Sequence, residues 1–188
     1  MNIAPFAERL QQCHMGQIEA HLAKLSAEDL AFRFFYPATL DSLRERYLAR
    51  LDPARDILLG IQIDGEIGAL AHLYVDRHKA EVGITVLPEH RETGLGEQLF
   101  EASILEARAL GCSQIAIETR PDNAPMIALA RSHGFTVGYD YGNIAGRLEL
   151  RPLEAAGMSL WTLHRLLDVG SGLWRSLFSG ESNDRHKP

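Results

Sequence analysis

The hydrophobic positions of residues 1–51 recur at helical spacing. Ile18, Leu22 and Leu25 stand four and three residues apart, which places them on one face of a helix. A second short helix is expected to begin within 26–29, because Ser-Ala-Glu-Asp has the form of a capping box. A third helix is expected within 39–51. The first quarter of the chain is therefore predicted to be helical throughout.

The period then changes to that of strands. Residues 57–63 and 67–75 are rich in β-branched and aliphatic residues, and the turn pair Asp64-Gly65 separates them. An Asp-Gly pair between two apolar runs is a strong hairpin signal. A third strand is expected at 80–87, where Pro88 ends it.

Helices and strands alternate in the next part of the chain. Apolar residues at helical spacing predict a helix over 94–109, followed by a short buried strand at 115–119 and a further helix at 125–132. A strand, helix, strand order of this kind predicts two parallel strands at the centre of a sheet. Two more strands, 135–139 and 144–150, are expected to pair antiparallel at the sheet edge.

These elements predict a single α/β (α+β) domain over residues 1–152, with a mixed, mostly antiparallel sheet flanked by helices. Residues 153–188 contain an apolar segment and a polar end, which predict a helical extension with a disordered terminus. The extension could cover an edge of the domain's own sheet, form a homodimer, or contact a lipid surface or a partner protein. Intramolecular packing or dimerisation is favoured, because basic residues are few.

Composition narrows the function classes. Hydrophobic residues make up 46% of the 188 residues and charged residues 23%, which is ordinary for a globular protein. The net charge of -6 argues against nucleic acid as a partner. With no apolar run near the N-terminus or of membrane-spanning length, we expect a cytoplasmic protein without a membrane partner. Cys13 and Cys112 match no metal-ligand spacing, so no metal is expected.

One segment carries candidate chemistry, because it lies between the strand at 80–87 and the helix at 94–109. Glycines let a loop backbone approach a ligand, and the N–H groups at a helix N-terminus suit phosphate oxygens. A strand-to-helix turn that needs glycine is the alternative reading, and the segment is neither a P-loop nor a dinucleotide fingerprint. Its residues are Arg91, Glu92, Thr93, Gly94, Leu95 and Gly96.

Further features follow this segment in a set order, and together they resemble the GNAT acetyltransferase superfamily over residues 17–150. That family shows a strand, the motif Q/R-x-x-G-x-G/A, a helix, a strand, then Asn and a helix that ends in Gly-Phe. The corresponding features here are the strand at 80–88, the motif at 91–96, the strand at 115–119, Asn123, Leu129-Ala130 and Gly134-Phe135.

The resemblance implies a site for acetyl-CoA as co-substrate. Backbone groups around Thr85 and Val86 would hold the pantetheine arm and the acetyl carbonyl, and the amides from Glu92 to Gly96 would bind the pyrophosphate. Asn123 would form a hydrogen bond near the thiol end of the coenzyme. A helix N-cap before Pro125 is an equal reading of Asn123, and one residue can do both.

Acyl transfer to an amine requires a base that removes a proton from the nucleophile. Glu81 is the candidate, because protein-acetylating members of the family carry a catalytic glutamate in the same Ala-Glu-aliphatic context. An ordinary solvent-facing strand residue is the alternative. Many members also protonate the leaving thiolate with a tyrosine, but that position is Ala130 here. Tyr139, Tyr141 or water would then replace it, or the thiolate leaves unassisted.

The acceptor is left open. Residues 25–35 resemble a segment of GNAT domains related to bacterial protein-lysine acetyltransferases, which hints at a protein substrate, although two short amphipathic helices explain the same pattern. We expect transfer to a primary amine of a small molecule or of a protein lysine. The alternatives are an acyl-CoA-binding regulatory module with little catalysis and a structural domain without coenzyme.

Overall fold

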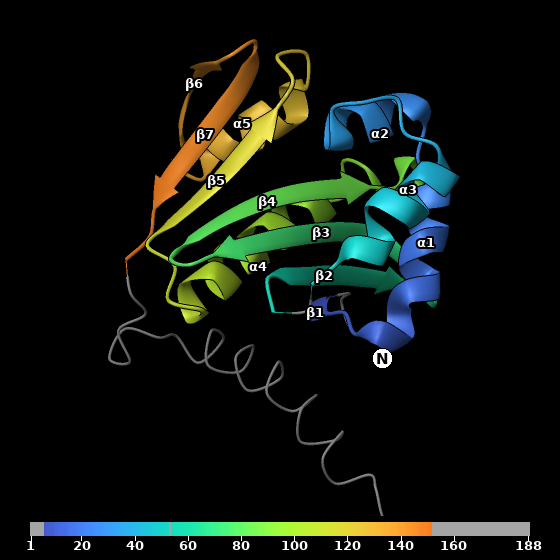
Figure 1. Ribbon diagram of the computed structural model, residues 1–188. Helices are drawn as coiled ribbons and strands as arrows, with labels where there is room; N and C mark the ends of the chain where they lie inside the picture. Colours follow the sequence, from blue (N-terminus) through green and yellow to red (C-terminus); the bar gives the residue numbers. More distant parts are fainter. Residues whose placement is uncertain (1–5, 53, 152–188) are drawn as a thin grey trace, which may run out of the picture. The chain divides into compact units, whose positions relative to one another are not determined.

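The computed structural model describes residues 6–52 and 54–151, which form a mixed sheet with helices on both faces (Figure 1). The elements are β1 (Ala7–Arg9), η1 (Gln12–His14), α1 (Met15–Lys24), α2 (Ala27–Phe34), α3 (Leu40–Arg46), η2 (Leu48–Arg50), β2 (Asp56–Ile63), β3 (Glu66–Asp76), β4 (Lys79–Val86), η3 (Pro88–His90), α4 (Leu95–Ala109), β5 (Gln114–Thr119), α5 (Ala124–Ser132), β6 (Thr136–Asp140) and β7 (Asn143–Glu149).

Within the described residues the strands form one seven-stranded sheet in the order β1-β2-β3-β4-β5-β7-β6. Strands β4 and β5 are parallel, and all other neighbours are antiparallel. This confirms the predicted single domain with a mixed sheet and one parallel pair. The pair β6 and β7 forms one edge, as the pattern of residues 135–150 predicts.

The hairpin of β2 and β3 has an almost continuously apolar sequence because both of its faces are buried. Successive side chains of a strand point to opposite faces, and here both faces are covered. Ile57 and Leu59 belong to the core under α4, whereas Leu58 between them packs with the N-terminal helices. The turn Asp64-Gly65 joins the two strands, as the sequence predicts.

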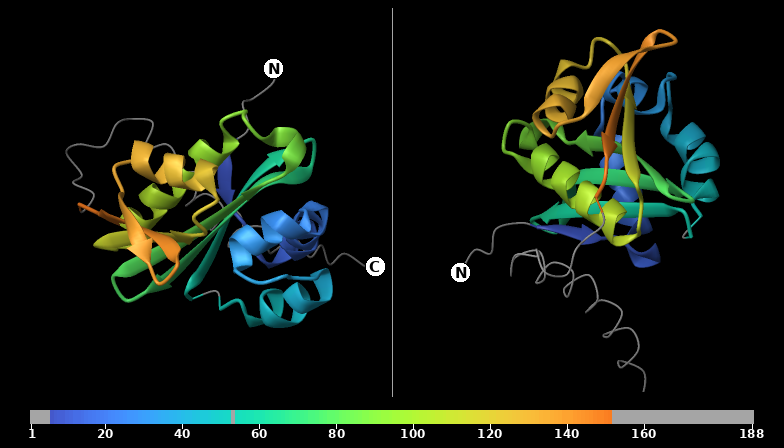
Figure 2. Two further views of the ribbon diagram at one scale, coloured as in Figure 1. Left: turned by 90° about the horizontal axis from the view of Figure 1, so that it is seen from above. Right: turned by 90° about the vertical axis from the view of Figure 1, so that its left-hand side faces the viewer.

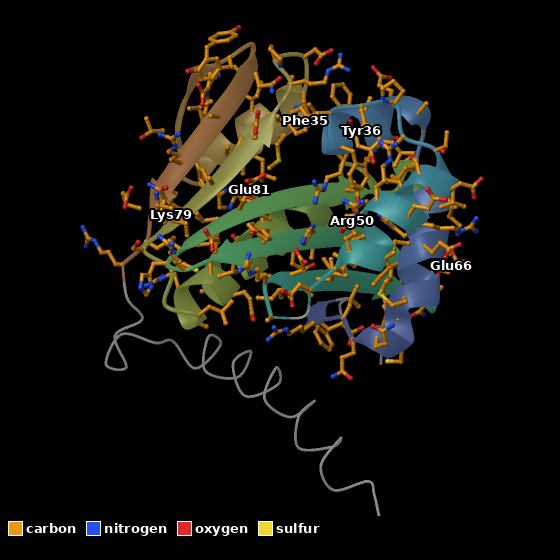
Figure 3. The ribbon with its side chains drawn as sticks, in the orientation of Figure 1. Phe35, Tyr36, Arg50, Glu66, Lys79 and Glu81 are labelled. Carbon is orange, nitrogen blue, oxygen red and sulfur yellow. The ribbon has the colours of Figure 1, made fainter. Side chains whose placement is uncertain are left out.

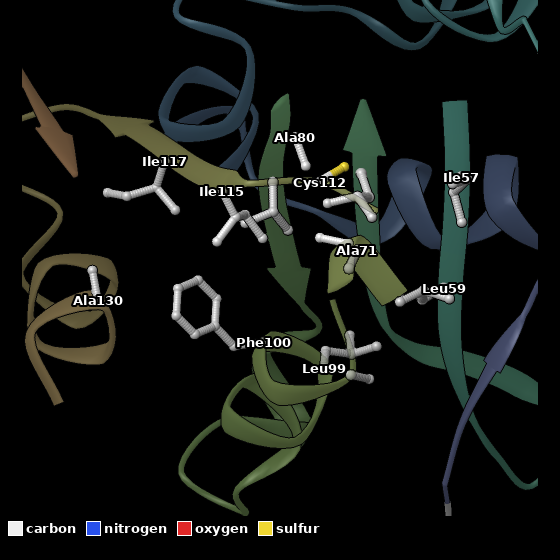
Figure 4. Packing of buried hydrophobic residues seen from close by; sticks show 14 of the residues in the cluster. Ile57, Leu59, Ala71, Ala80, Leu99, Phe100, Cys112, Ile115, Ile117 and Ala130 are labelled. Carbon is white, nitrogen blue, oxygen red and sulfur yellow. The ribbon is translucent and has the colours of Figure 1, made fainter. Parts of the chain in front are cut away.

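The two cores lie on opposite faces of the sheet. Helices α4 and α5 pack on one face and α1 to α3 on the other, as the two views of Figure 2 show. In the first core, Leu99 and Phe100 of α4 are fully buried against Ile115 and Ile117 of β5 (Figure 4). Ala130 of α5 is also fully buried in this core.

The N-terminal prediction was wrong in two places. Residues 7–9 form strand β1 rather than helix, because the free edge of β2 supplies backbone partners such as Ile61 for Ala7. The third helix ends at Arg46 and is followed by a 3-10 turn instead of continuing to Leu51. The first departure comes from a tertiary contact that overrides local helical spacing.

The predicted helical extension over 153–188, with its proposed dimer contact, lies outside the described residues. Among the residues that are described, no helix is long and apolar enough to span a membrane.

Candidate functional site

The parallel pair β4–β5 is short. Only Lys79, Ala80 and Glu81 pair with Gln114 to Ala116, although both strands continue beyond this point. Residues 82–86 of β4 and 117–119 of β5 therefore separate into a fork, visible in Figure 1 as the opening between the two strands. Backbone groups of β4 that face the fork have no strand partner there, so they are available to an extended ligand.

A cavity of about 520 Å³ follows this fork. Its lining comes from α2, from β4 with the following loop, and from the end of β5 with the start of α5. Most of the predicted coenzyme residues meet here, namely Thr85, Val86, Arg91, Glu92, Gly94, Gly96 and Asn123. Thr93 and Leu95 do not line it. The hydroxyl of Thr93 donates to the His90 carbonyl at 2.6 Å, and Leu95 is buried under the sheet.

The loop before α4 is shaped for backbone recognition. Gly94 is the N-cap of α4 and has a φ of 86°, a left-handed conformation that side chains rarely adopt. The first N–H groups of the helix that follows have no intrahelical acceptor, and they carry the positive end of the helix dipole. α4 is 15 residues long, so its dipole is fully developed, and Gly94 and Gly96 at its start line the cavity. This end of the helix therefore forms a donor-rich site there.

Arg91 ties the loop to two other elements. Its Nε donates to the Val86 carbonyl at the end of β4 (3.2 Å), and its Nη2 forms an ion pair with Asp29 Oδ1 of α2 (2.7 Å). Although partial burial alone would raise it, the pKa of Asp29 is lowered by hydrogen bonds from Ser26 and Arg91. Asp29 also completes the capping box of Ser26 that the sequence predicts. The motif loop and α2 are thereby held together.

Asn123 has the double position that the sequence left open. Its Oδ1 accepts from the Met126 amide at 3.3 Å, which caps α5, and its Nδ2 donates to Thr119 Oγ1 at 2.8 Å. The residue also lines the cavity. Thr85 lines the cavity as well, but its hydroxyl is hydrogen-bonded to buried His21 Nε2 at 2.8 Å and its backbone pairs with Leu70 of β3.

Glu81 lies at the point where the fork begins (Figure 3). Its side chain reaches solvent, yet partial burial of the carboxyl group raises its pKa, the negative charge of Glu118 raises it further, and the positive charge of Arg33 opposes both. Glu118 on β5 also lines the cavity, where its Oε1 accepts from Asn143 Nδ2 at 2.8 Å. A base with a raised pKa is better matched to proton removal near neutral pH.

Arg33 of α2 is a cavity residue that sequence reasoning missed. Its guanidinium lies over Gly83 of β4, so closely that a Cβ at that glycine would stand 2.4 Å from Arg33 Cζ. A glycine inside a strand often marks close approach by another group, and Gly83 was the signal that could have revealed it. The sequence does not say which group approaches.

The α2 side of the cavity carries two aromatic residues. Phe32 and Phe35 line it, and Phe35 ends the helix with a φ of 62°, exposed to solvent (Figure 3). The guanidinium of Arg120, from the loop before α5, lies 5.1 Å from the ring centre of Phe32. This contact joins α2 to the β5 side of the cavity.

The two candidate tyrosines are not brought to the site. Tyr139 of β6 is 81% exposed and Tyr141 in the following turn is 104% exposed, and neither lines the cavity. Met126 and Leu129 of α5 do line it, and neither carries an acidic proton. Within the described residues, the cavity therefore contains no tyrosine.

Comparison with known proteins gives the same picture of the fold. A family model described as the Acetyltransferase (GNAT) family matches residues 24–135. The GNAT domain of PAT from S. lividans is similar over 77% of this chain and 89% of its own, with 22% identity and a TM-score of 0.66.

Two further solved structures are similar to the chain. A putative acetyltransferase from Salmonella typhimurium, solved with its cofactor acetyl-CoA, matches with 21% identity and a TM-score of 0.61, covering 81% of this chain and 98% of its own. The ribosomal-protein-S18-alanine N-acetyltransferase from Escherichia coli matches with 21% identity and a TM-score of 0.60, covering 83% and 99%. At such identities the likeness shows a shared fold.

Proposed function

Because this chain belongs to the acetyltransferase (GNAT) family, it is an acetyl-CoA-dependent N-acetyltransferase, and we propose that it transfers the acetyl group directly to a primary amine with Glu81 as the base. The observation that carries the proposal is the position of Glu81. Its carboxylate stands at the start of the fork, in the same cavity as the motif loop.

In the proposed complex, acetyl-CoA lies along the fork. The amides of the loop 92–96 bind its pyrophosphate. The backbone edge of β4 around Thr85 and Val86, which has no strand partner on the fork side, bonds the amide-containing pantetheine arm as a further strand would. Asn123 contributes polar groups from the opposite side. The thioester then lies toward Glu81, since this residue marks the closed end of the fork.

The proposed reaction is a direct transfer. Glu81 accepts a proton from the acceptor ammonium, directly or through one water, and the neutral nitrogen attacks the thioester carbonyl. A bond forms between nitrogen and the acetyl carbon, the C–S bond breaks, and the electron pair leaves on sulfur. A coenzyme thiol is acidic enough to leave as thiolate, which then takes, directly or through water, the second proton that the attacking nitrogen loses as the amide forms. Neither Tyr139 nor Tyr141 is needed for this step.

The acceptor that fits the α2 side of the cavity is a cationic amine on an apolar stem. Phe32 and Phe35 provide apolar surface, and the carboxylates of Glu81 and Glu118 line the same cavity. Two carboxylates attract an ammonium group before its proton is removed. Lysine side chains and small alkylamines both have this form.

Replacement of Glu81 tests the base. Glu81→Gln should lower turnover at saturating substrates by about 100-fold or more, which is the usual contribution of a general base. The rise in melting temperature with acetyl-CoA should stay the same, because the coenzyme contacts are untouched. Release of free thiol is measured across a panel of primary amines that includes Nα-acetyl-lysine amide and butylamine.

Glu45→Gln is the matched control, since Glu45 is exposed on α3 and does not line the cavity. Unchanged turnover in Glu81→Gln would remove Glu81 as the base. If the unmodified protein binds acetyl-CoA but no amine in the panel produces thiol, the result would favour the binding module without catalysis that Ala130 suggests.

A further inference from the structure

The guanidinium of Arg33 is held in place from behind the cavity. Its Nη2 lies 3.2 Å from His72 Nδ1, and His72 Nε2 lies 2.7 Å from Asp56 Oδ1. These residues come from α2, β3 and β2, so the arrangement depends on the whole first half of the domain. A chain of three polar residues that ends at the cavity lining implies a task for the last one.

The protonation states of this chain follow from its surroundings. Burial lowers the pKa of His72, and the positive charge of Arg33 lowers it further, against the opposing effect of Asp56. The imidazole is therefore neutral, with Nε2–H donating to Asp56 and Nδ1 free to accept from Arg33. The carboxylate of Asp56 thus selects the tautomer that can hold the guanidinium.

Aromatic residues complete the support. The ring of Phe34 lies 5.1 Å from Arg33 Cζ, and Tyr47 packs against both Phe34 and His72 with ring centres 5.1 and 5.4 Å away. Burial raises the pKa of Tyr47 to about 12, so its hydroxyl stays protonated beside the cation. Arg33 thus has little freedom to turn away from the cavity.

Gly83 gives the guanidinium its place on β4. It stands two residues from Glu81, hence on the same face of the strand, and opposite His72 in the β3–β4 register. The charged groups that act on Glu81 are Arg33 from α2 and Glu118 from β5. On β3 its cross-strand neighbour is Tyr74, and on β7 the nearest charged position in register is Arg147, opposite Ala116.

We propose that Arg33, fixed by His72 and Asp56 and lying over Gly83, is a positioning residue whose charge keeps the Glu81 carboxylate ionised at the fork against the repulsion of Glu118. The proposal rests on the proposed role of Glu81 as base. It adds that the base depends on a cation that residues of β3 and β2 hold in place. Without that cation, burial and Glu118 would together raise the pKa of Glu81 further and so increase the share of the protonated acid, which cannot accept a proton.

The test follows the titration of Glu81 itself, so it needs no acceptor. The carboxyl carbon signals of ¹³C-labelled glutamates are recorded against pH, and Glu81 is assigned as the signal that Glu81→Gln loses. In Arg33→Met the midpoint of Glu81 should rise by about one pH unit, the lower end of the effect of a nearby opposite charge. Arg33→Lys should restore part of this shift.

Two further variants separate electrostatics from packing. His72→Gln leaves the cavity lining unchanged but loosens the guanidinium, and it should raise the Glu81 midpoint by a smaller amount. Arg46→Met removes an equal charge from the exposed face of α3 and should leave the midpoint in place. Each variant is first shown to be folded by its melting temperature and by its shift with acetyl-CoA.

An unchanged Glu81 midpoint in folded Arg33→Met would overturn the inference, as would an equal rise in Arg46→Met. The proposed function is checked separately by the pH dependence of kcat/KM with the best acceptor of the amine panel. If the Glu81 midpoint rises but the acid limb of that profile does not follow it, Glu81 is not the base, and only the electrostatic link to Arg33 stands.

Discussion

The two sides of the cavity are built from different groups. On the side of residues 91–96 and the start of α4, the available donors are backbone amides arranged by Gly94. On the side of α2, the groups are side chains, namely Phe32 and Phe35 in the lining and Arg33 beside β4. A backbone site depends on chain conformation, whereas a side-chain site depends on charge and shape, so the two sides should respond to different substitutions.

Among the substitutions that distinguish the two sides of the cavity, the largest effect is expected at Gly94. A valine there would face no atom within 4 Å of its Cβ, so any effect comes from the φ of 86° and not from a collision. The left-handed conformation costs a side chain about 1–2 kcal/mol, more when it is β-branched, and the loop should rearrange. The Kd of acetyl-CoA in Gly94→Val, measured by calorimetry, should rise more than about tenfold.

The control for this prediction is Gly142→Val. Gly142 has a φ of 92° in the turn between β6 and β7 and does not line the cavity. A valine there would be under similar backbone strain, but outside the proposed coenzyme contacts. Its variant should lose stability but keep its affinity. Equal losses of affinity in both variants would mean that the loop conformation is not what binds the coenzyme.

A smaller effect is expected from Glu118 on the acceptor side. Glu118→Gln removes a negative neighbour, so the raised pKa of Glu81 should fall and the acid limb of kcat/KM should move to lower pH. The KM of the best amine should rise about threefold, as for the loss of one exposed charge pair. The Kd of acetyl-CoA should not change. A changed Kd would show that Glu118 contributes to coenzyme binding rather than to acceptor binding.

The smallest effect concerns the stability of the fold around the cavity, to which buried His21 contributes. His21 is 2% exposed and joins α1 to β4 through Thr85, and burial lowers its pKa despite the Ile67 carbonyl. The unfolded chain then binds more protons than the native one below its ordinary pKa, about 6.5. This contribution to stability is complete above that value and is lost as the pH falls below it.

Urea unfolding at about pH 7.5 and about pH 5.5 measures this loss, and His21→Gln, which cannot titrate, is the reference. The free energy of unfolding of the unmodified protein should fall more on acidification than that of the variant. An equal fall in the free energy of unfolding of both proteins would show that His21 is not the titrating group.

Much of the fold could be predicted because its signals are local. The hairpin around Asp64-Gly65 and the helix after Gly94 each follow from a few neighbouring residues. Strand β1 could not, because three residues become a strand only where the edge of β2 accepts them.

The candidate site divides in the same way. The loop from Arg91 to Gly96 is continuous in sequence, so its position at the cavity could be expected. Arg33 could not, because its place depends on Gly83 and His72, which are 50 and 39 residues away. Tyr139 and Tyr141 have the right chemistry, but the edge strand β6 and the turn after it leave them in solvent, which a local pattern does not reveal.

The short pairing of β4 with β5 has a consequence for how such a chain can diverge. Every residue except proline offers the same backbone N–H and C=O groups, so substitutions in residues 82–86 that respect packing leave these groups of the fork in place. Three positions are constrained by their neighbours: Val82 is buried in the core, Gly83 must leave room for a guanidinium, and Thr85 is hydrogen-bonded to His21. Exposed residues of the acceptor side such as Phe35 are less constrained, so the acceptor specificity of such a fold can change while its coenzyme site is retained.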